Sequence, residues 1–461
     1  MKNIVIYIGI SLAILTIISF ISYFIYCKCF NNYLNKSLNN QVKRKNHFFP
    51  RSYLTFICLP ILACSVFYWG VFGVISAVKT TPEIPTNLEF ELKNDDTYKV
   101  IGFDTWVDKE LVIPKKFNGK PVTEIEEDVF SGTYMVSVYI PDTVTKIGER
   151  AFSDCLRLEN VRLSCNLVEI ADYTFYNCLS LENIMIPDSV VTIGEGAFQN
   201  CQYLESIVFG EGIKTIKKNA FSYCMELEDA LIPDTVLTIH DYAFNKCINL
   251  KNLKLSLKLE SIGEYAFSST NISEITIPDN VGTIGKGAFS SCQKLKCVTL
   301  GNNMRIVADE TFEDCESLVE VKFGANITYV GRYAFSNCKK LSNIEFNDKV
   351  ETISQYAFSN CYELKKVSLS TSTKYISDYA FSNCRMLENI NVGESLIAIY
   401  DNAFIGCQNL RKLTLPRTLK YINGSGLEIK DIYFNGTKEE WEKIEKEYFY
   451  NHINVIILIV T

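Results

Sequence analysis

Apolar positions recur with a period of 23 residues over most of the chain. Phenylalanine marks this period, with ten of twelve intervals equal to 23 residues and two equal to 22, at positions 130, 152, 175, 198, 221, 244, 267, 289, 312, 335, 358, 381 and 404. Self-similarity at a fixed period of this length is typical of solenoids, in which each repeat forms one coil. The pattern therefore predicts one array of stacked coils.

Each repeat contains a short run in which apolar residues alternate with other residues, as in Ile275-Thr276-Ile277-Pro278. Alternation with period two predicts a strand, and proline ends it because proline cannot donate to the strand ladder. A second short extended piece, such as residues 190–193, comes next. The segment 194–201 has the character of a helical turn.

The remaining apolar positions surround the phenylalanine. Alanine commonly precedes it, cysteine follows it by three residues and leucine by six, as in Ala197, Phe198, Cys201 and Leu204. We expect these side chains to point inward. A single coil cannot bury them alone, so neighbouring coils must stack to form a continuous core.

The pattern L-x-x-I-x-[IL]-P with A-F-x-x-C resembles the BspA-like, or treponemal-type, leucine-rich repeat family over about residues 98–446. Residues 111–125 resemble the first repeat of that family and residues 433–444 its last. The resemblance implies a leucine-rich repeat solenoid, β-rich with short helical turns. Counting the phenylalanines, we expect about thirteen 23-residue coils. The family also implies surface proteins that adhere to host matrix, host cells or other microbes.

Two long uncharged apolar stretches open the chain, at about residues 4–26 and 53–78. Each exceeds the roughly 20 residues that a helix needs to cross a hydrocarbon core of about 30 Å. They predict a two-helix transmembrane hairpin preceding the solenoid, and a cleaved signal peptide is the alternative for the first stretch. The expected domains are therefore helix 1 with the N-terminus (1–27), a basic loop (28–52), helix 2 (53–79), a linker (80–97), the solenoid (98–432) and a C-terminal cap (433–461).

Charge is distributed unevenly along the chain. The loop at 28–52 is basic and contains no acid, and short loops rich in Lys and Arg stay in the cytoplasm. We therefore expect a multi-pass protein of the cell membrane whose repeats are extracellular. All 53 acidic residues and all but eight of the 46 Lys and Arg lie beyond residue 82, which gives that part a net charge of −15. Such a surface repels phosphate backbones, so nucleic acid is not an expected partner.

Seventeen cysteines occur, and eleven of them occupy one equivalent repeat position, at 155, 178, 201, 224, 247, 292, 315, 338, 361, 384 and 407. Their side chains would all point inward in the same direction. A disulfide needs two Cβ atoms facing each other at about 3.8 Å. We therefore expect a ladder of buried free thiols that act as small hydrophobic side chains.

Residues that could perform chemistry are scarce. Three histidines occur, at positions 47, 240 and 452, and neither a nucleophile motif nor a phosphate-binding loop stands in a supporting context. Cys165 and Cys297 lie off the thiol ladder without a neighbouring histidine, so zinc is not supported. We expect no catalytic residue, no cofactor and no metal site, and therefore not an enzyme.

The central residue of the alternating run is expected to face outward from the predicted strand. Most members of this column are polar, but three consecutive ones, Met185, Val208 and Leu231, are apolar, and Arg162 and Lys254 flank them along the array. An exposed apolar patch bordered by charge is a common feature of interaction sites. These five residues are the predicted ligand-binding surface.

The sequence favours a cell-surface adhesin or receptor whose solenoid face binds an extracellular protein or glycan, from host matrix, host cell or another microbe. A structural scaffold that organises partner proteins at the cell envelope is the alternative. An envelope enzyme with an unrecognised site is a third hypothesis. Many weak contacts along a sheet suit adhesion, because avidity compensates for modest affinity.

Overall fold

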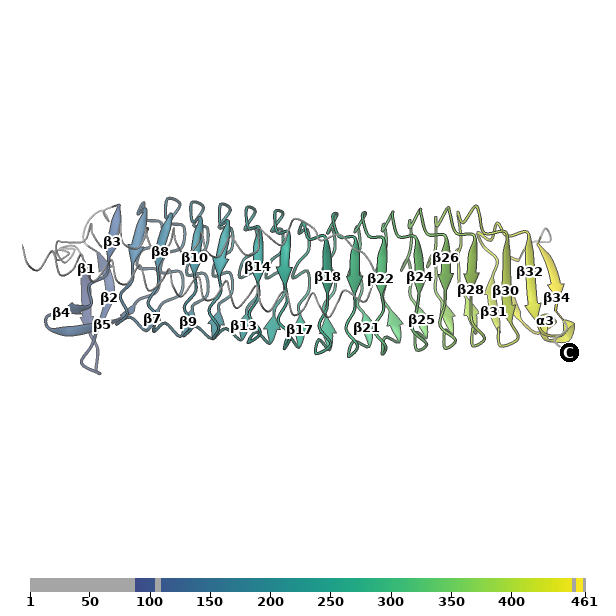
Figure 1. The fold of residues 1–461 in the computed structure, drawn as a ribbon, viewed down its shortest axis with the longest axis horizontal. Coiled ribbons are helices and arrows are strands. Elements are labelled where there is room, and N and C mark those ends of the chain that lie inside the picture. Colours follow the sequence, from purple (N-terminus) through teal and green to yellow (C-terminus); the bar gives the residue numbers. More distant parts are fainter. Residues whose placement is uncertain (1–87, 104–108, 450–452, 459–461) are drawn as a thin grey trace, which may run out of the picture. The chain divides into compact units, whose positions relative to one another are not determined.

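The computed structural model describes residues 88–103, 109–449 and 453–458. Contact clustering separates residues 82–461 as one compact unit, and the fold described below belongs to this unit. Its coils stack along one direction, and a typical coil contributes one strand to each of two columns of strands (Figure 1). The fold is thus a β-solenoid of about 15 turns.

The first column runs along the upper side of Figure 1 and contains mostly three-residue strands. Most neighbours pair in parallel, so that Met185 stands opposite Val208 and Leu231 opposite Lys254. The strands are β3 (Glu110–Val112), β6 (Ser137–Tyr139), β8 (Asn160–Arg162), β10 (Asn183–Met185), β12 (Ser206–Val208), β14 (Asp229–Leu231), β16 (Asn252–Lys254), β18 (Glu274–Thr276), β20 (Cys297–Thr299), β22 (Glu320–Lys322), β24 (Asn343–Glu345), β26 (Lys366–Ser368), β28 (Asn389–Asn391), β30 (Lys412–Pro416), β32 (Asp431–Asn435) and β34 (Asn454–Ile457).

The second column contains mostly two-residue strands. Most neighbouring strands pair in parallel, and most paired residues are 22 or 23 positions apart in the sequence, as at Thr192, Thr215 and Thr238. In most of these strands the first side chain is exposed or half-buried and the second is buried. The strands are β7 (Lys146–Ile147), β9 (Glu169–Ile170), β11 (Thr192–Ile193), β13 (Thr215–Ile216), β15 (Thr238–Ile239), β17 (Ser261–Ile262), β19 (Thr283–Ile284), β21 (Ile306–Val307), β23 (Tyr329–Val330), β25 (Thr352–Ile353), β27 (Tyr375–Ile376), β29 (Ala398–Ile399), β31 (Tyr421–Asn423) and β33 (Glu445–Glu447).

The first described strands form a small sheet at the start of the stack. β1 (Leu88–Leu92) pairs antiparallel with β2 (Tyr98–Phe103), and β4 (Lys116–Phe117) pairs antiparallel with β5 (Lys120–Ile125). Strand β5 then pairs in parallel with β2 and β7, which starts the second column. Towards the other end, the helix α3 (Lys438–Glu442) begins at a capping box formed by Thr437 and Glu440.

The predicted helical turns form as hydrogen-bonded turns and not as α-helix: the Cys178 N–H donates to the Phe175 carbonyl three residues back, at 3.3 Å. The Phe175 N–H donates to the Ala197 carbonyl in the next coil at 2.8 Å, and the Asn177 N–H donates to the Gln199 carbonyl at 2.8 Å. These donors therefore do not bond four residues back along the chain, as an α-helix requires. Asn177 also has a φ of 58°, in the left-handed region that interrupts a right-handed helix.

The fold-class prediction was wrong in the number of coils, and its transmembrane hairpin finds no support. About 15 turns replace the expected thirteen, because coils at both ends lack the phenylalanine signature by which coils were counted. The predicted spans, at 1–27 and 53–79, lie outside the described residues. None of the helices in the described ranges has the length and apolar character that a bilayer crossing requires.

The centre of the core is a stack of phenylalanine rings, one from each coil that carries the repeat signature. The rings of Phe198 and Phe221 lie 5.2 Å apart and 1° from parallel, and the rings of Phe175 and Phe198 lie 5.4 Å apart. Both distances fall in the range preferred by offset-stacked aromatic pairs. Because these rings are fully buried, each contributes about 1.5–3 kcal/mol through removal of apolar surface from water.

Candidate binding surface

Three apolar side chains project from neighbouring strands of the first column. Met185, Val208 and Leu231 end strands β10, β12 and β14, and they are 52%, 55% and 61% exposed. The residue before each one points into the core because side chains alternate between the two faces of a strand. We call these three residues the apolar ridge. Their predicted exposure is confirmed, whereas their role in binding stays a prediction.

The two basic residues at the ends of the apolar ridge, Arg162 and Lys254, differ in the contacts of their side chains. The Arg162 guanidinium pairs with Asp142 at 2.9 Å, donates to the Ile140 carbonyl at 2.8 Å and lies 4.6 Å from the centre of the Tyr139 ring. All three contacts come from the preceding coil. Arg162 is therefore directed away from Met185. Lys254 is exposed and stands opposite Leu231 in the neighbouring strand β16.

Acidic side chains border the apolar ridge across the strands. Each ridge residue has a carboxylate three positions before it and another three positions after it. The preceding acids are Glu182, Glu205 and Glu228, and the following acids are Asp188, Glu211 and Asp234. The ridge is therefore bordered by negative charge on both sides, and by Lys254 at one end.

This arrangement is confined to three successive coils within the described part of the stack. The coil of Lys254 has Lys251 and Leu257 at the corresponding flanking positions. The coil of Asn391 has two flanking acids, Glu388 and Glu394, but its central residue is polar. The apolar centre and the paired acids thus occur together only in the coils of β10, β12 and β14.

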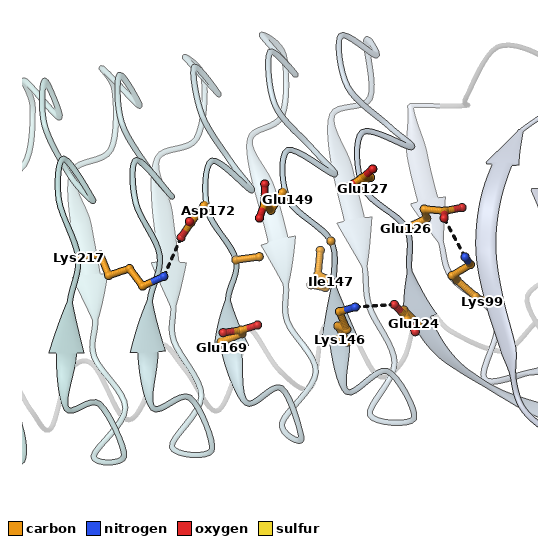
Figure 2. A pocket seen from close by; sticks show the side chains of 12 residues that line it. Lys99, Glu124, Glu126, Glu127, Lys146, Ile147, Glu149, Glu169, Asp172 and Lys217 are labelled. Atoms are coloured by element: carbon orange, nitrogen blue, oxygen red, sulfur yellow. Dashed lines mark hydrogen bonds and ion pairs between the residues drawn. The ribbon is translucent and has the colours of Figure 1, made fainter. Parts of the chain in front are cut away.

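A second surface feature is a hollow of about 480 Å³ near the start of the stack, shown in Figure 2. Six carboxylates and three lysines line it, together with Ile147, Gly148 and Ala171. The lysines join coils through three ion pairs. Lys99–Glu126 at 2.8 Å and Lys146–Glu124 at 2.9 Å link neighbouring coils, and Lys217–Asp172 at 3.1 Å links coils that lie two apart. Three of the six carboxylates are paired in this way, and with six carboxylates against three lysines the lining keeps a net charge of −3.

Ion pairing changes the acidity of the groups in the hollow. Burial opposes ionisation of Glu124, but hydrogen bonds from Lys146 and Lys93 outweigh it and hold the pKa of Glu124 below its ordinary value. Hydrogen bonds to Glu126 and Glu91 raise the pKa of Lys99. Among the described residues, no group of three or more His, Cys, Asp or Glu side chains has a geometry that could hold a metal ion. The hollow therefore offers a mixed-charge surface rather than a metal site.

The acids that border the apolar ridge were not among the predicted ligand-binding residues. The signal was present in the sequence. An acid, two residues, an apolar residue, two residues and a second acid recur three times with a 23-residue period, beginning at Glu182, Glu205 and Glu228. The ridge and its acidic borders together form the candidate binding surface.

The parallel coils, their aromatic and leucine core and their exposed strand face define a leucine-rich repeat solenoid. The chain belongs to the family described as BspA type leucine rich repeat region (6 copies), whose profile matches residues 123–247, 214–342 and 328–456. These matches cover more than half of the chain and point to no catalytic family. The predicted family resemblance is confirmed.

A solved structure shows the same fold. A leucine-rich repeat protein from Bacteroides ovatus is 25% identical, with a TM-score of 0.54, over 82% of this chain and 100% of that one. A leucine rich cell surface protein from Faecalibacterium prausnitzii is 24% identical (TM-score 0.42, 80% and 98% covered), and the pneumococcal vaccine antigen PcpA is 18% identical (TM-score 0.49, 82% and 98% covered). No curated protein sequence matches the chain.

Proposed function

We propose that the chain is a surface protein that adheres to an extracellular protein or glycan through the face centred on the apolar ridge. The observation that supports this function is the exposure of Met185, Val208 and Leu231, each more than half exposed, on three neighbouring coils. Contiguous exposed apolar side chains with a polar rim are typical of protein interaction sites.

The size of the apolar ridge sets the strength of the contact. Burial of three such side chains contributes about 1.5–3 kcal/mol each. Association costs roughly 4–15 kcal/mol in lost translational and rotational freedom and in side-chain ordering. The ridge alone therefore supports weak binding, and many copies on one surface would bind firmly through avidity. Weak, multivalent contact is what adhesion requires.

Membership in the BspA-type family supports extracellular repeats and a binding role in place of catalysis. Cleavage by protease added outside intact cells tests the placement. A tag after Thr461 should be lost on intact cells, and a tag that is digested only after lysis would contradict the extracellular placement. A scaffold of the cell's own envelope would bind envelope proteins in preference to host or microbial surfaces.

Substitution of the ridge tests the binding role. Met185→Ser combined with Leu231→Ser in the full-length chain should weaken capture of host matrix, host cells or other microbes by roughly a hundredfold or more, since two contacts of about 1.5–3 kcal/mol each are lost. The matched control is Ile306→Ser with Val319→Ser, which removes two exposed apolar side chains elsewhere in the array. Unchanged capture by the ridge variant, at an unchanged melting temperature, would contradict the binding role of the apolar ridge.

A further inference from the structure

Three of the six acidic side chains that border the apolar ridge make no contact in the described part of the chain that stabilises the fold. Among the described residues, the side chains of Glu182, Glu205 and Glu211 have neither a hydrogen-bond partner nor an ion pair. Asp188 and Asp234 each accept a backbone N–H from the next coil, at 2.9 and 3.0 Å. Three exposed carboxylates therefore face solvent around the ridge without neutralisation.

These carboxylates lie close enough to the apolar ridge to attract a cation bound on it. Three residues of extended chain cover about 10 Å, so each acid lies within roughly that distance of its ridge residue. The Debye length at physiological ionic strength is about 8 Å, so a cation seated on the ridge would be screened only in part from acids on both sides. The one pairing in this group, Glu228 with Lys251 at 2.7 Å, lies at the end nearest Lys254. A polyanionic ligand would be repelled here, and a cationic one attracted.

The spacing of the ridge residues discriminates between partner conformations. Neighbouring coils lie about 4.8 Å apart, so the ridge covers two steps, or about 9.6 Å. Two turns of an α-helix rise about 10.8 Å, a mismatch of about 1 Å. An extended strand laid along the stack places alternate side chains about 6.8 Å apart, and two such steps differ from the ridge by about 4 Å. A helix along the stack axis therefore matches the ridge better than a strand.

We propose that the apolar ridge binds a cationic amphipathic α-helix of a partner protein, which lies along the stack of coils. Its apolar stripe contacts Met185, Val208 and Leu231, and Lys or Arg on both edges of that stripe face the two rows of acids. An apolar stripe with i, i+3, i+4 and i+7 anchors is the usual means by which helices bind apolar surfaces. This inference rests on the proposed function, because it assigns the chemistry of the partner at the same surface.

The probes are synthetic peptides of about 18 residues, which form about five helical turns. One has a leucine stripe flanked by lysines, the second has the same stripe flanked by glutamates, and the third has the lysine composition in scrambled order. Binding to the full-length chain is followed by fluorescence anisotropy. We expect the lysine helix to bind roughly tenfold or more tightly than the other two, and more weakly as ionic strength rises from about 0.05 to about 0.3 M.

Charge removal at the ridge gives the decisive comparison. The variant Glu182→Gln, Glu205→Gln, Glu211→Gln removes three carboxylates that make no structural bond, and it should weaken binding of the lysine helix roughly tenfold. The matched control Glu363→Gln, Glu388→Gln, Glu394→Gln removes the same charge from exposed positions in later coils, and its affinity should change less than about twofold. Equal losses in both variants would overturn the assignment to the ridge.

The outcomes separate this inference from the proposed function. Equal binding of the glutamate helix or of the scrambled peptide would overturn the cationic or the helical part. If the lysine helix does not bind while Met185→Ser with Leu231→Ser still abolishes capture of cells or matrix, the adhesive function stands and the partner chemistry is wrong. If the serine variant captures normally, the proposed function fails.

Discussion

The thiol of Cys201 donates a hydrogen bond to the backbone carbonyl of Phe175 in the preceding coil, with a sulfur–oxygen distance of 3.2 Å. The same bond recurs along the stack, for example from Cys178 to Phe152 at 3.1 Å. The repeated cysteine is therefore a donor that joins successive coils as well as a small apolar side chain. Where threonine replaces it, the Thr270 hydroxyl donates instead to the Phe267 carbonyl of its own coil, at 2.9 Å.

Replacement of Cys201 should separate these two contributions. We expect Cys201→Ala to lower the free energy of unfolding by about 1–2 kcal/mol, because it removes a donor and leaves a small void. Cys201→Thr should cost about half as much or less, since threonine at position 270 already fills this site. Thermal unfolding measures both, with the exposed Cys165→Ala as control. An alanine variant as stable as the wild type would show that the thiol bond contributes nothing.

Thiol reactivity should divide the described cysteines into two groups. Burial raises the pKa of Cys201 to about 12, so its thiolate is scarce at neutral pH. Cys165 and Cys297 are exposed. Alkylation of the native chain at about pH 8, followed by peptide mapping, should modify these two within minutes and leave Cys201 unmodified until denaturant is added. Rapid modification of Cys201 in the native state would contradict the buried ladder.

An asparagine ladder offers a test of backbone strain. Asn360 has a φ of 60°, its amide donates to Asn337 at 2.9 Å, and it accepts from Asn383 at 2.9 Å. Asn360→Ala loses both bonds and retains a Cβ in the left-handed region, so we expect a cost of about 2 kcal/mol. Asn360→Gly loses the bonds but relieves the strain, and should cost about 1 kcal/mol less. The ranking is checked by urea unfolding, and an alanine variant more stable than glycine would refute it.

Stability should depend on pH through Glu313. Burial first, and then the charges of Asp314 and Glu310, raise the pKa of Glu313 from 4.5 to about 7. The folded chain therefore binds this proton more tightly than the unfolded chain. The protonated carboxyl favours folding, and stability falls as pH rises from about 4.5 through about 7. Because Glu313 is partly exposed, solvent screening reduces the effect to about 1 kcal/mol.

Glu313→Gln should remove this part of the pH dependence. We expect its melting temperature to exceed that of the wild type at about pH 8 and to match it at about pH 4, where Glu313 is protonated. The exposed Glu363→Gln controls for the loss of one carboxylate. An equal pH dependence in the wild type and in Glu313→Gln would rule out Glu313 as its source.

The core could be predicted from the sequence because one register repeats. Phe198, Cys201 and Leu204 were expected to point inward, and all three are fully buried. The exposed ridge followed from the same register, since alternation along a strand fixes which face each side chain occupies. Domain boundaries and the binding role of the ridge stay predictions.

The turns and the end coils were harder to predict for a physical reason. The segment around Phe175 has residues compatible with a helical turn, but its N–H groups bond to the next coil, and a pattern within one repeat does not show partners in another. Phe103 stacks on Phe130 at 5.8 Å and extends the aromatic stack by a coil that lacks the cysteine signature. A count based on signatures therefore omits the ends.

The stacking of Phe198 on Phe221 has a consequence for heredity. Each core residue meets its own counterpart one coil away, so a replication error that duplicates or deletes one 23-residue unit creates no new kind of contact. A duplication between Met185 and Val208 would add one apolar step and two carboxylates to the ridge, and a deletion would remove them. The affinity for a partner would then change by the contribution of one coil at a time across generations, while the core contacts stay the same.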